Sequence, residues 1–444
     1  MNNPDRLFNK NFVLLWQGQL VSQIGNQAYR IAIMFWLMQV TESSTLMGII
    51  MMFSFLPAFF ISPIAGTIAD IYSRKKIIIL SDIIGGAVLT LFAVFMLYLD
   101  SNPELNWNNN PATITLVVVF LFIVSILIGV LNSFFMPTIG AVIPDIVPKN
   151  KIMKANSLKL ISRHLSRFIG QSAGGVLFRI IGAPLLLLID GLSFIFSAVS
   201  ESFISIPQLS AEDKKADLKA NLIRSFKREF LEGFRYAWNN KGLRNLIFVI
   251  AFINFLFMPI IILLPFHTEN YLNVTADWYG FMMAADGLGI VLGAMLTSNI
   301  NVSGKKRSIF TLISLFISSA ATILLGITRI PLLALLCIFI SGFFIGIVAV
   351  TIEAIAQISS PAKIRGRVLG FITMINSGII PMAMGISGII GDLLNHNTPL
   401  IFIVSGCIAV LLSILVFIDP APRKFLEYEP EDETPNIINK IPKH

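Results

Sequence analysis

Long apolar segments separated by short polar ones dominate the chain. A run of about 20 apolar residues is long enough for a helix to cross a bilayer, and turn and charge signals divide the sequence into twelve such runs. The predicted spans are 11–40, 45–69, 77–99, 112–143, 155–181, 183–206, 245–271, 277–301, 308–328, 331–358, 366–394 and 398–418. The pattern therefore predicts an all-α membrane protein with twelve transmembrane helices.

One long polar segment, residues 207–244, divides these spans into two groups of six. This predicts two six-helix bundles, over 1–206 and 245–419, a cytoplasmic linker between them and a tail over 420–444. Apolar residues recur in the linker every four positions, which favours an amphipathic helix along the inner leaflet over an ordinary solvated linker. These residues are Leu218, Leu222, Phe226, Phe230, Phe234 and Trp238.

The amino-acid composition also indicates a membrane protein. Of the 444 residues, 55% are hydrophobic and only 13% are charged, too few charges for the surface of a soluble domain of this size. The first apolar run is too long for a cleavable signal and is expected to be retained as a span. Cys337 and Cys407 both lie in apolar runs, so neither a disulfide framework nor a cysteine metal site is expected.

The net charge of +8 is unevenly distributed. Basic groups such as 74–76 and 305–307 fall on the side of the two termini, and only Arg179 and Arg329 are expected near the other face. The loops of the other side, near 41–44, 100–111, 269–277 and 395–398, contain no Lys or Arg. The positive-inside rule then predicts a plasma (inner) membrane protein with both termini in the cytoplasm and no nucleic-acid partner.

A short polar turn joins the second and third spans. Gly66, Asp70, Arg74 and Lys75 belong to a GxxxD pattern followed by a basic triplet, which places one carboxylate and three cations at the membrane surface. This turn resembles the corresponding loop of the major facilitator superfamily. The resemblance implies the major facilitator fold, alternating access, and a gate.

In that gate, Asp70 would lie against the positive end of the eleventh helix, near Gly366 and Arg367. An internal repeat should supply a second copy of the turn. Lys305-Lys306-Arg307 keeps the cations of Arg74-Lys75-Lys76, but Asn301 stands where Asp70 would be.

Several phrases within the superfamily are similar to the drug-exporting branch that includes the macrolide efflux proteins. They are Leu15-Trp16-Gln17-Gly18-Gln19, Leu56-Pro57, Pro144-Asp145-Ile146-Val147-Pro148, Ala155-Asn156-Ser157, Ile189-Asp190 and Gly366-Arg367-Val368. This similarity implies proton-driven export of amphipathic small molecules, with macrolide-like drugs as the leading candidates.

The fifth span carries a glycine-rich motif. Gly170, Gln171, Gly174 and Gly175 match the end of a pattern found in antiporters of the superfamily, but Gln171 replaces the expected proline. Small residues also let helices approach closely. The motif is therefore equally compatible with antiport and with simple helix packing.

Polar side chains inside the spans are candidates for the substrate cavity. Gln19, Gln23, Asn26 and Arg30 follow one another at steps of three or four residues and form one polar helix face, which lipid does not tolerate. Glu353 and Gln357 continue a similar stripe in the tenth span. The resemblance implies that the first, fourth, seventh and tenth helices line the cavity, which would place Arg30, Asn132, Asn254 and Glu353 around it.

Ionisable residues in hydrocarbon are functional candidates because they are costly. Glu353 is the first candidate for a proton-coupling carboxyl group, since apolar surroundings favour its neutral form, and Asp286 is the second. Either is also compatible with a buried ion pair, with Arg30 as one partner. Asp82, Asp190 and Glu201 fall on helices that resemble peripheral scaffold, so a structural role is predicted for them.

Lys159, Arg163 and Arg167 carry positive charge into the fifth span. They either pair with Asp82, Asp145 or Glu201, or attract anionic substrates such as siderophores, acidic amphiphiles or lysolipids. The alternative function is therefore export of an endogenous anionic metabolite or lipid.

An enzyme is not expected. His164, His267, His396 and His444 are scattered without metal-ligand spacing, and no P-loop is present. We therefore expect no cofactor and no metal, and a monomer whose partners are a small-molecule substrate, protons and the bilayer.

Overall fold

The computed structural model describes residues 7–107, 110–206, 231–232, 234–300, 302–360 and 365–429. These residues form helices and no strands. In chain order the elements are α1 (Lys10–Thr41), α2 (Ser44–Ile71), α3 (Arg74–Ser101), α4 (Pro111–Ile146), the 3-10 turn η1 (Lys149–Lys151), α5 (Ile152–Ser202), α7 (Lys241–Phe266), the π-helical turn η2 (His267–Tyr271), α8 (Ala276–Asn299), α9 (Gly304–Ile327), α10 (Pro331–Ser359), α11 (Arg365–Leu393), α12 (Thr398–Ile418) and α13 (Pro420–Leu426).

The helix α5 contains two of the predicted spans. Gly182 interrupts it with φ 73° and ψ 176°, a left-handed φ that glycine adopts without a steric penalty. Pro184 follows in the first turn of the second arm of α5, the part after Gly182. Proline fits there because the backbone N–H of the first turn has no acceptor within the helix. Ten segments of the described chain are long and apolar enough to cross a bilayer, with α5 counted once. Dividing α5 and adding the more polar α1 gives twelve, which confirms the predicted all-α architecture.

Local capping explains where many of these helices begin. A free N–H in the first turn needs an acceptor, and Ser or Asn supplies it at several junctions. Asn9 Oδ1 accepts from Phe12 N at 3.0 Å, and Ser43 Oγ accepts from Leu46 N at 3.2 Å. Ser73 caps α3 in the same way. The third span therefore begins at Arg74 rather than at residue 77, which leaves a turn of two residues after α2.

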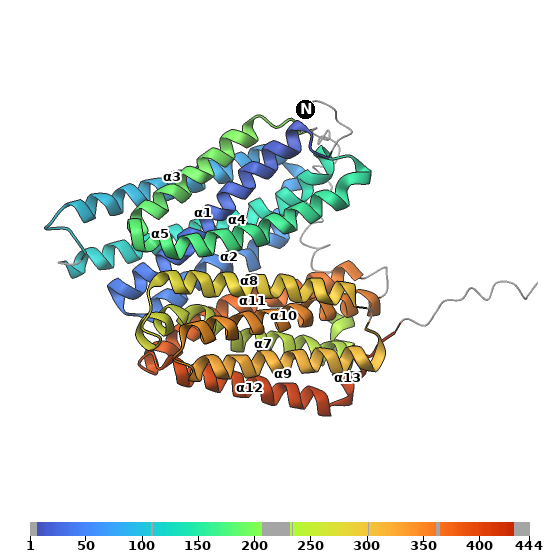
Figure 1. The fold of residues 1–444 in the computed structure, drawn as a ribbon. Helices are drawn as coiled ribbons and strands as arrows, with labels where there is room; N and C mark the ends of the chain where they lie inside the picture. The colour runs from blue at the N-terminus through green and yellow to red at the C-terminus, as the bar shows by residue number, and fades with distance from the viewer. Residues whose placement is uncertain are drawn as a thin grey trace, which may run out of the picture.

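The helices form two groups, which Figure 1 shows one above the other. We call α1–α5 the N-terminal bundle and α7–α12 the C-terminal bundle. Within the first, α1 and α3 pack on α5 and α2 packs on α4; within the second, α8 and α9 pack on α10 and α12 packs on α9. The two bundles meet mainly through the pairs α2 with α11 and α5 with α8.

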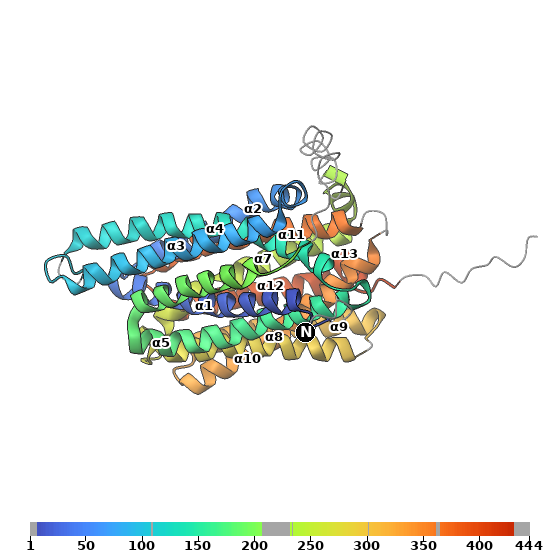
Figure 2. The same ribbon diagram turned by 90° about the horizontal axis from the view of Figure 1, so that it is seen from above.

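Both views place the start of α1 and the helix α13 at the same end of the molecule (Figures 1 and 2). The basic residues of the α2–α3 and α8–α9 junctions belong to this end, which we call the basic end. The other end carries the α1–α2, α3–α4 and α11–α12 junctions, and we call it the opposite end.

Large apolar side chains are exposed along the outer helices. Leu91 is 69% exposed and Leu332 is also 69% exposed, and many similar residues accompany them. Such a surface is unfavourable in water but suits acyl chains. The exposed apolar surface therefore agrees with a position in the bilayer.

The linker and tail are described only in part. Residues 207–230 and 430–444 lie outside the described residues, so most of the predicted amphipathic helix and the domain boundaries remain predictions. Phe234 and Trp238, which are described, stack on each other, and Phe234 also meets Phe371 of α11 edge to face. The start of the predicted tail is the helix α13, whose Leu426 is buried against the C-terminal bundle.

Glycines allow helices of one bundle to touch through their backbones. A Cβ at Gly293 of α8 would overlap the carbonyl oxygen of Phe343 in α10, and one at Gly342 would lie 2.5 Å from the carbonyl oxygen of Asp286. Neither neighbour is a flexible side-chain end, so the α8–α10 pair has no room for a larger residue.

Gly293→Leu should therefore lower the free energy of unfolding by roughly 1–3 kcal/mol or more, the range for overpacked interiors. Gly370→Leu is the matched control, because Gly370 faces open space and gains the same side chain in a helix. Thermal unfolding of the purified protein in detergent measures both. Equal melting temperatures for the two variants would contradict the close packing of α8 on α10.

Candidate functional site

The predicted polar face of α1 is hydrogen-bonded within the protein. Gln19 Nε2 donates to Glu201 Oε1 at 3.0 Å, and Gln23 Nε2 donates to Gln19 Oε1 at 3.3 Å. One turn further on, Arg30 Nε donates to Asn26 Oδ1 at 3.0 Å. These bonds satisfy groups that lipid would leave without partners.

Arg30 lies at a junction of several elements. Its guanidinium carbon is 4.4 Å from the ring centroid of Phe55 in α2, a cation–π contact. It also interacts electrostatically with Arg167 of α5, which in turn interacts with Asp286 of α8. Within the described residues, no ion pair joins Arg30 to Asp286 or Glu353. Arg30 and Arg167 therefore place two positive charges near the boundary between the bundles.

The other predicted cavity residues divide between the bundles. Asn132 of α4 lines a small cavity inside the N-terminal bundle, next to Asp82. Asn254 and Glu353 line a different cavity of about 370 Å³ in the C-terminal bundle, where Asn254 Nδ2 donates to Asn376 Oδ1 at 3.3 Å. Arg30 does not line either of these two cavities.

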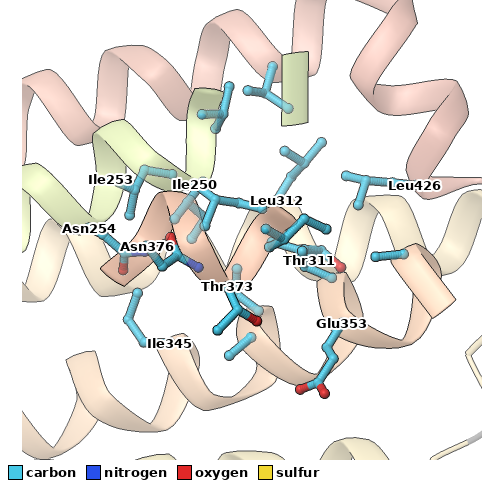
Figure 3. Close-up of a pocket in the computed structure, with 18 of the residues that line it drawn as sticks. Ile250, Ile253, Asn254, Thr311, Leu312, Ile345, Glu353, Thr373, Asn376 and Leu426 are labelled. Atoms are coloured by element: carbon cyan, nitrogen blue, oxygen red, sulfur yellow. Dashed lines mark hydrogen bonds between the residues drawn. The ribbon is translucent and has the colours of Figure 1, made fainter. Parts of the chain in front are cut away.

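The cavity of the C-terminal bundle is mostly apolar (Figure 3). Leu312 and Ile253 are among its walls, and the two asparagines meet on one side. Glu353 is exposed at its edge, with the carboxylate turned away from Leu312, and Gln357 Nε2 donates to it at 3.4 Å. An apolar pocket with a few polar groups suits a small amphipathic molecule.

Arg74 holds the predicted gating turn in place. It donates to Asp145 Oδ2 at 2.6 Å and to the carbonyl oxygens of Ala69 and Ala141 at 3.2 and 3.1 Å. The turn is thereby bound to the end of α4. In the second repeat, Arg307 Nε donates to the carbonyl oxygen of Leu426 at 2.9 Å instead.

The other residues of the predicted gate are described in part. A Cβ at Gly66 or at Gly366 would meet open space, and Lys75 is half-buried. Arg367 pairs with Glu232, which precedes α7. The side chain of Asp70 is outside the described residues, so the role of Asp70 as a gate stays a prediction.

The glycine motif of α5 packs on two sides. Gly170 and Gly174 face α1, where a Cβ would lie 2.6 Å from the carbonyl oxygen of Ile24 or 2.8 Å from Ala28 Cα. Gly175 faces α8 of the other bundle, where a Cβ would lie 2.7 Å from the carbonyl oxygen of Ala276. Gln171 contributes its carbonyl oxygen to the same contact with Gly280. The motif thus brings α5 close to both α1 and the C-terminal bundle.

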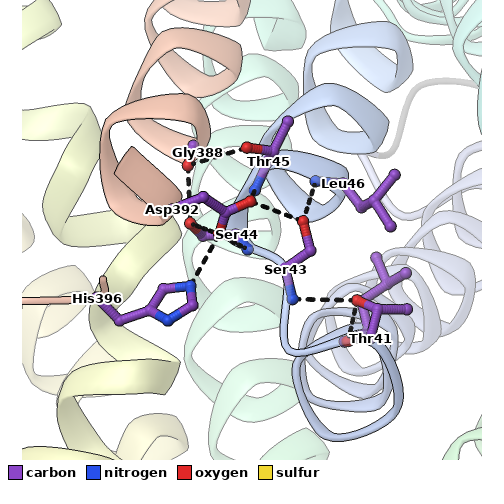
Figure 4. A network of polar contacts seen from close by, with 9 residues as sticks. Thr41, Ser43, Ser44, Thr45, Leu46, Gly388, Asp392 and His396 are labelled. Atoms are coloured by element: carbon purple, nitrogen blue, oxygen red, sulfur yellow. Dashed lines mark hydrogen bonds and ion pairs between the residues drawn. The ribbon is translucent and has the colours of Figure 1, made fainter. Parts of the chain in front are cut away.

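At the opposite end, Asp392 of α11 caps the N-terminus of α2 (Figure 4). Its Oδ1 accepts from Ser44 N and Ser44 Oγ, both at 2.7 Å, and its Oδ2 accepts from Ser43 Oγ at 2.8 Å and Thr45 N at 3.0 Å. His396 Nε2 lies 2.8 Å from Oδ1. A carboxylate at the positive end of a helix is stabilised by the free N–H groups and the helix dipole. We call this group of contacts the Asp392 clamp.

The bundles are therefore joined at one end. Backbone contacts between Gly48 and Gly388 and between Gly175 and Gly280 accompany the Asp392 clamp near the opposite end. At the basic end, the motif glycines Gly66 and Gly366 have open space beside them.

Comparison with known proteins identifies the family. Residues 5–438 match the family described as transmembrane secretion effector. The chain belongs to this family of major facilitator transporters. Macrolide efflux protein A of Streptococcus pyogenes is 26% identical over 409 residues, which cover 91% of this chain and 94% of that protein. The multidrug efflux pump Tap of Mycolicibacterium fortuitum is 23% identical over 423 residues, which cover 93% and 98%.

A solved structure shares the fold of this transporter. The bacterial homologue of the human lysosomal transporter Spinster, in an inward-facing and unoccupied conformation, has a TM-score of 0.68 at 15% identity and covers 95% of this chain and 98% of its own. The major facilitator fold implied by the resemblance is thus confirmed, and the chain is a membrane transporter rather than an enzyme.

The Asp392 clamp of this transporter escaped sequence reasoning. Residues 43–45 and Asp392 are 347 residues or more apart in the chain. Neither segment by itself has a pattern that predicts the contact. The available signal was a run of three hydroxyl residues, Ser43-Ser44-Thr45, at the start of one span and an acid at the end of another. That signal becomes specific only when the helix pairing is known.

Loss of the clamp should open the opposite end. Asp392→Ala removes every acceptor, whereas Asp392→Asn keeps one oxygen, so the alanine variant should have the larger effect. The reporter is a cysteine in place of Met384, which is buried beside Gly48. In the Asp392→Ala protein this cysteine should react with a membrane-impermeant maleimide about tenfold faster or more than in the protein with Asp392, because the loss of one charged hydrogen bond changes the opening equilibrium by about that factor.

The measurement uses a chain in which Cys337 and Cys407 are replaced by alanine. Asp100→Asn, an exposed acid of the same end, is the control. An unchanged rate in Asp392→Ala would show that the clamp does not hold the bundles together.

Proposed function

We propose that this transporter exports amphipathic small molecules, with macrolide-like drugs as the leading candidates, by proton-driven alternating access. The observation that carries this proposal is the similarity to macrolide efflux protein A over 91% of the chain. The apolar cavity with paired asparagines in the C-terminal bundle supports it.

In this proposal the basic end faces the cytoplasm and the transporter acts as a monomer in the plasma membrane. The described state is then open toward the cytoplasm, because the Asp392 clamp and the glycine contacts close the opposite end. Switching requires those contacts to separate while α2 and α11 approach each other at the basic end. Asp70 near Gly366 would hold that second state.

Two groups are proposed for proton coupling. Glu353 is exposed at the edge of a cavity, where a substrate can change its surroundings, and Asp286 lies across the bundle boundary from Arg167. Substrate cavity residues would be Gln23, Asn26 and Arg30 on one side. Asn254, Glu353 and Gln357 would form the other side.

A second candidate function is export of an endogenous anionic metabolite or lipid, such as a siderophore or lysophospholipid. It is supported by Lys159, Arg163 and Arg167, because the described structure shows no ion pair for any of the three. Asp145, one expected partner, instead binds Arg74. Unpaired cations at this depth attract negative charge.

Transport in everted membrane vesicles tests the main proposal. A radiolabelled macrolide should accumulate when a proton gradient is imposed and should leave the vesicles when an uncoupler collapses the gradient. Uptake of a labelled lysophospholipid, with no macrolide uptake, would favour the second function. Accumulation of macrolide that persists without the gradient would contradict proton coupling.

Glu353→Gln and Asp286→Asn should each reduce gradient-driven accumulation by about 5-fold or more, the lower end of usual coupling energies. Exchange of labelled for unlabelled substrate without a gradient should continue, because a neutral amide preserves the shape of the site. Glu104→Gln, in an exposed loop, is the control. If both carboxyl variants accumulate substrate normally, neither group couples protons to transport.

Asp70→Asn should slow transport while leaving the melting temperature nearly unchanged, since the residue acts in the state with a closed basic end. Initial rates of macrolide uptake and thermal unfolding are measured on the same preparation. A wild-type rate from well-folded Asp70→Asn protein would remove the turn from the mechanism.

A further inference from the structure

Three acidic side chains are buried inside the N-terminal bundle. Asp82 of α3 is 1% exposed, and Asp190 and Glu201 of the second arm of α5 are 0% and 1% exposed. They lie outside the cavity that holds Glu353.

The three acids share one row with hydroxyl groups. Asp190, Ser193, Ser197 and Glu201 follow at steps of three or four residues, so they lie on one face of the arm. That face meets α1: a Cβ at Gly25 would lie 2.6 Å from Asp190 Oδ1, and one at Gly18 would lie 3.0 Å from Ser197 Oγ. Asp82 interacts electrostatically with both other acids.

The row has unused hydrogen-bonding capacity. One carboxyl oxygen of each acid is buried without a hydrogen-bond partner in the described structure. The hydroxyl of Ser197 lies beside both Asp82 and Glu201 and interacts with each of them. The other contacts are Gln19 Nε2 donating to Glu201 at 3.0 Å and Ser193 Oγ donating to Asp190 Oδ1 at 3.3 Å. Beside Asp82, Ser81 and Asn132 is a cavity of about 10 Å³, the room of about one water molecule.

Few charged groups face the row. From α1, Arg30 and the phenol of Tyr29 act electrostatically on Asp190, and α4 contributes the neutral Asn132. No ion pair reaches any of the three acids in the described part of the chain. Three unpaired carboxylates in a dry interior would be very unfavourable. Protonation removes the charge and adds a donor to each group.

The direction of the row fits proton movement. Asp190 and Glu201 are eleven residues apart on one helix, which is about 16 Å along its axis, or half of a hydrocarbon core of about 30 Å. Asp190 lies near Arg30, and Glu201 lies one residue before the basic end of α5. The row therefore joins the region of the bundle boundary to the basic end.

We infer that Asp82, Asp190 and Glu201 form a proton-binding row that carries the coupling protons from mid-membrane to the basic end. Glu201 releases its proton at the basic end, the proton of Asp82 moves to Glu201 and that of Asp190 moves to Asp82. Asp190 then takes up a new proton from the bundle boundary, so all three carboxyl groups are protonated again at the end of each cycle. A substrate that binds near Arg30, or a movement of Arg167 relative to Arg30, changes the electrostatic potential at Asp190. Proton release from the row is thereby linked to transport. This inference rests on the proton coupling proposed above and names further groups that perform it.

Macrolide transport by Asp82→Asn, Asp190→Asn and Glu201→Gln in everted vesicles tests the inference. Each variant should lose about 5-fold or more of gradient-driven accumulation and lose its dependence on external pH, while exchange without a gradient continues. A merely structural role would reduce both activities together. Glu104→Gln is again the control.

An infrared measurement covers the case in which these variants fold poorly. The band of protonated carboxyl groups is recorded at neutral pH in the Asp286→Asn and Glu353→Gln double variant, where the row is intact. A protonated-carboxyl band that shifts on deuteration is the expected result, and its absence would overturn the inference.

The transport outcomes separate the two proposals. If the wild-type protein accumulates substrate without any proton gradient, the proposed coupling fails, and the inference fails with it. If the wild type requires the gradient and all three row variants keep normal gradient-driven accumulation, only the inference is wrong.

Discussion

The scarcity of water inside a bilayer constrains this structure more than any single contact does. Each backbone amide in a span must be bonded within its own helix, and each polar side chain must find a protein partner. The polar face of α1 shows the consequence: Gln19 and Gln23 bond toward Glu201, and Asn26 bonds to Arg30. Because lipid cannot solvate these groups, α1 has to be packed among other helices, and the second arm of α5 is folded back along it.

Close backbone contact provides the second constraint. Dispersion and packing, rather than the hydrophobic effect, hold helices together in lipid, so small residues are needed where helices cross. Gly175 and Gly280 allow α5 to touch α8, and Gly48 and Gly388 allow α2 to touch α11. Both contacts join the bundles near the opposite end. Near the basic end, a Cβ at Gly66 of α2 or at Gly366 of α11 would meet no described atom within 4 Å, so these two motif glycines do not make a close contact of this kind.

Much of the fold could be predicted from the sequence because the signals are local. Span length and the break at Gly182-Ala183-Pro184 each depend on a few neighbouring residues. The Ser73 cap is equally local, but the predicted third span began at residue 77 instead of Arg74. The helix α13 was missed because seven residues, Pro420–Leu426, give too short a pattern. The Asp392 clamp was missed because its partners are brought together only by helix pairing. The resemblance placed Asn132 around a central cavity, and the structure adds that it lines a small cavity with Asp82.

The two bundles differ in the burial of their acidic side chains, and this difference bears on the mechanism. The acids of the N-terminal bundle, Asp82, Asp190 and Glu201, are buried, whereas Glu353 in the C-terminal bundle is exposed at a cavity edge. An exposed carboxyl group at a cavity edge can meet a substrate directly. In the inference above, the buried acids hold protons and release them when their surroundings change. If the N-terminal bundle binds the protons and the C-terminal bundle binds the substrate, proton binding and substrate binding would be coupled across the boundary between the bundles. Arg30, Arg167 and Asp286 interact at this boundary.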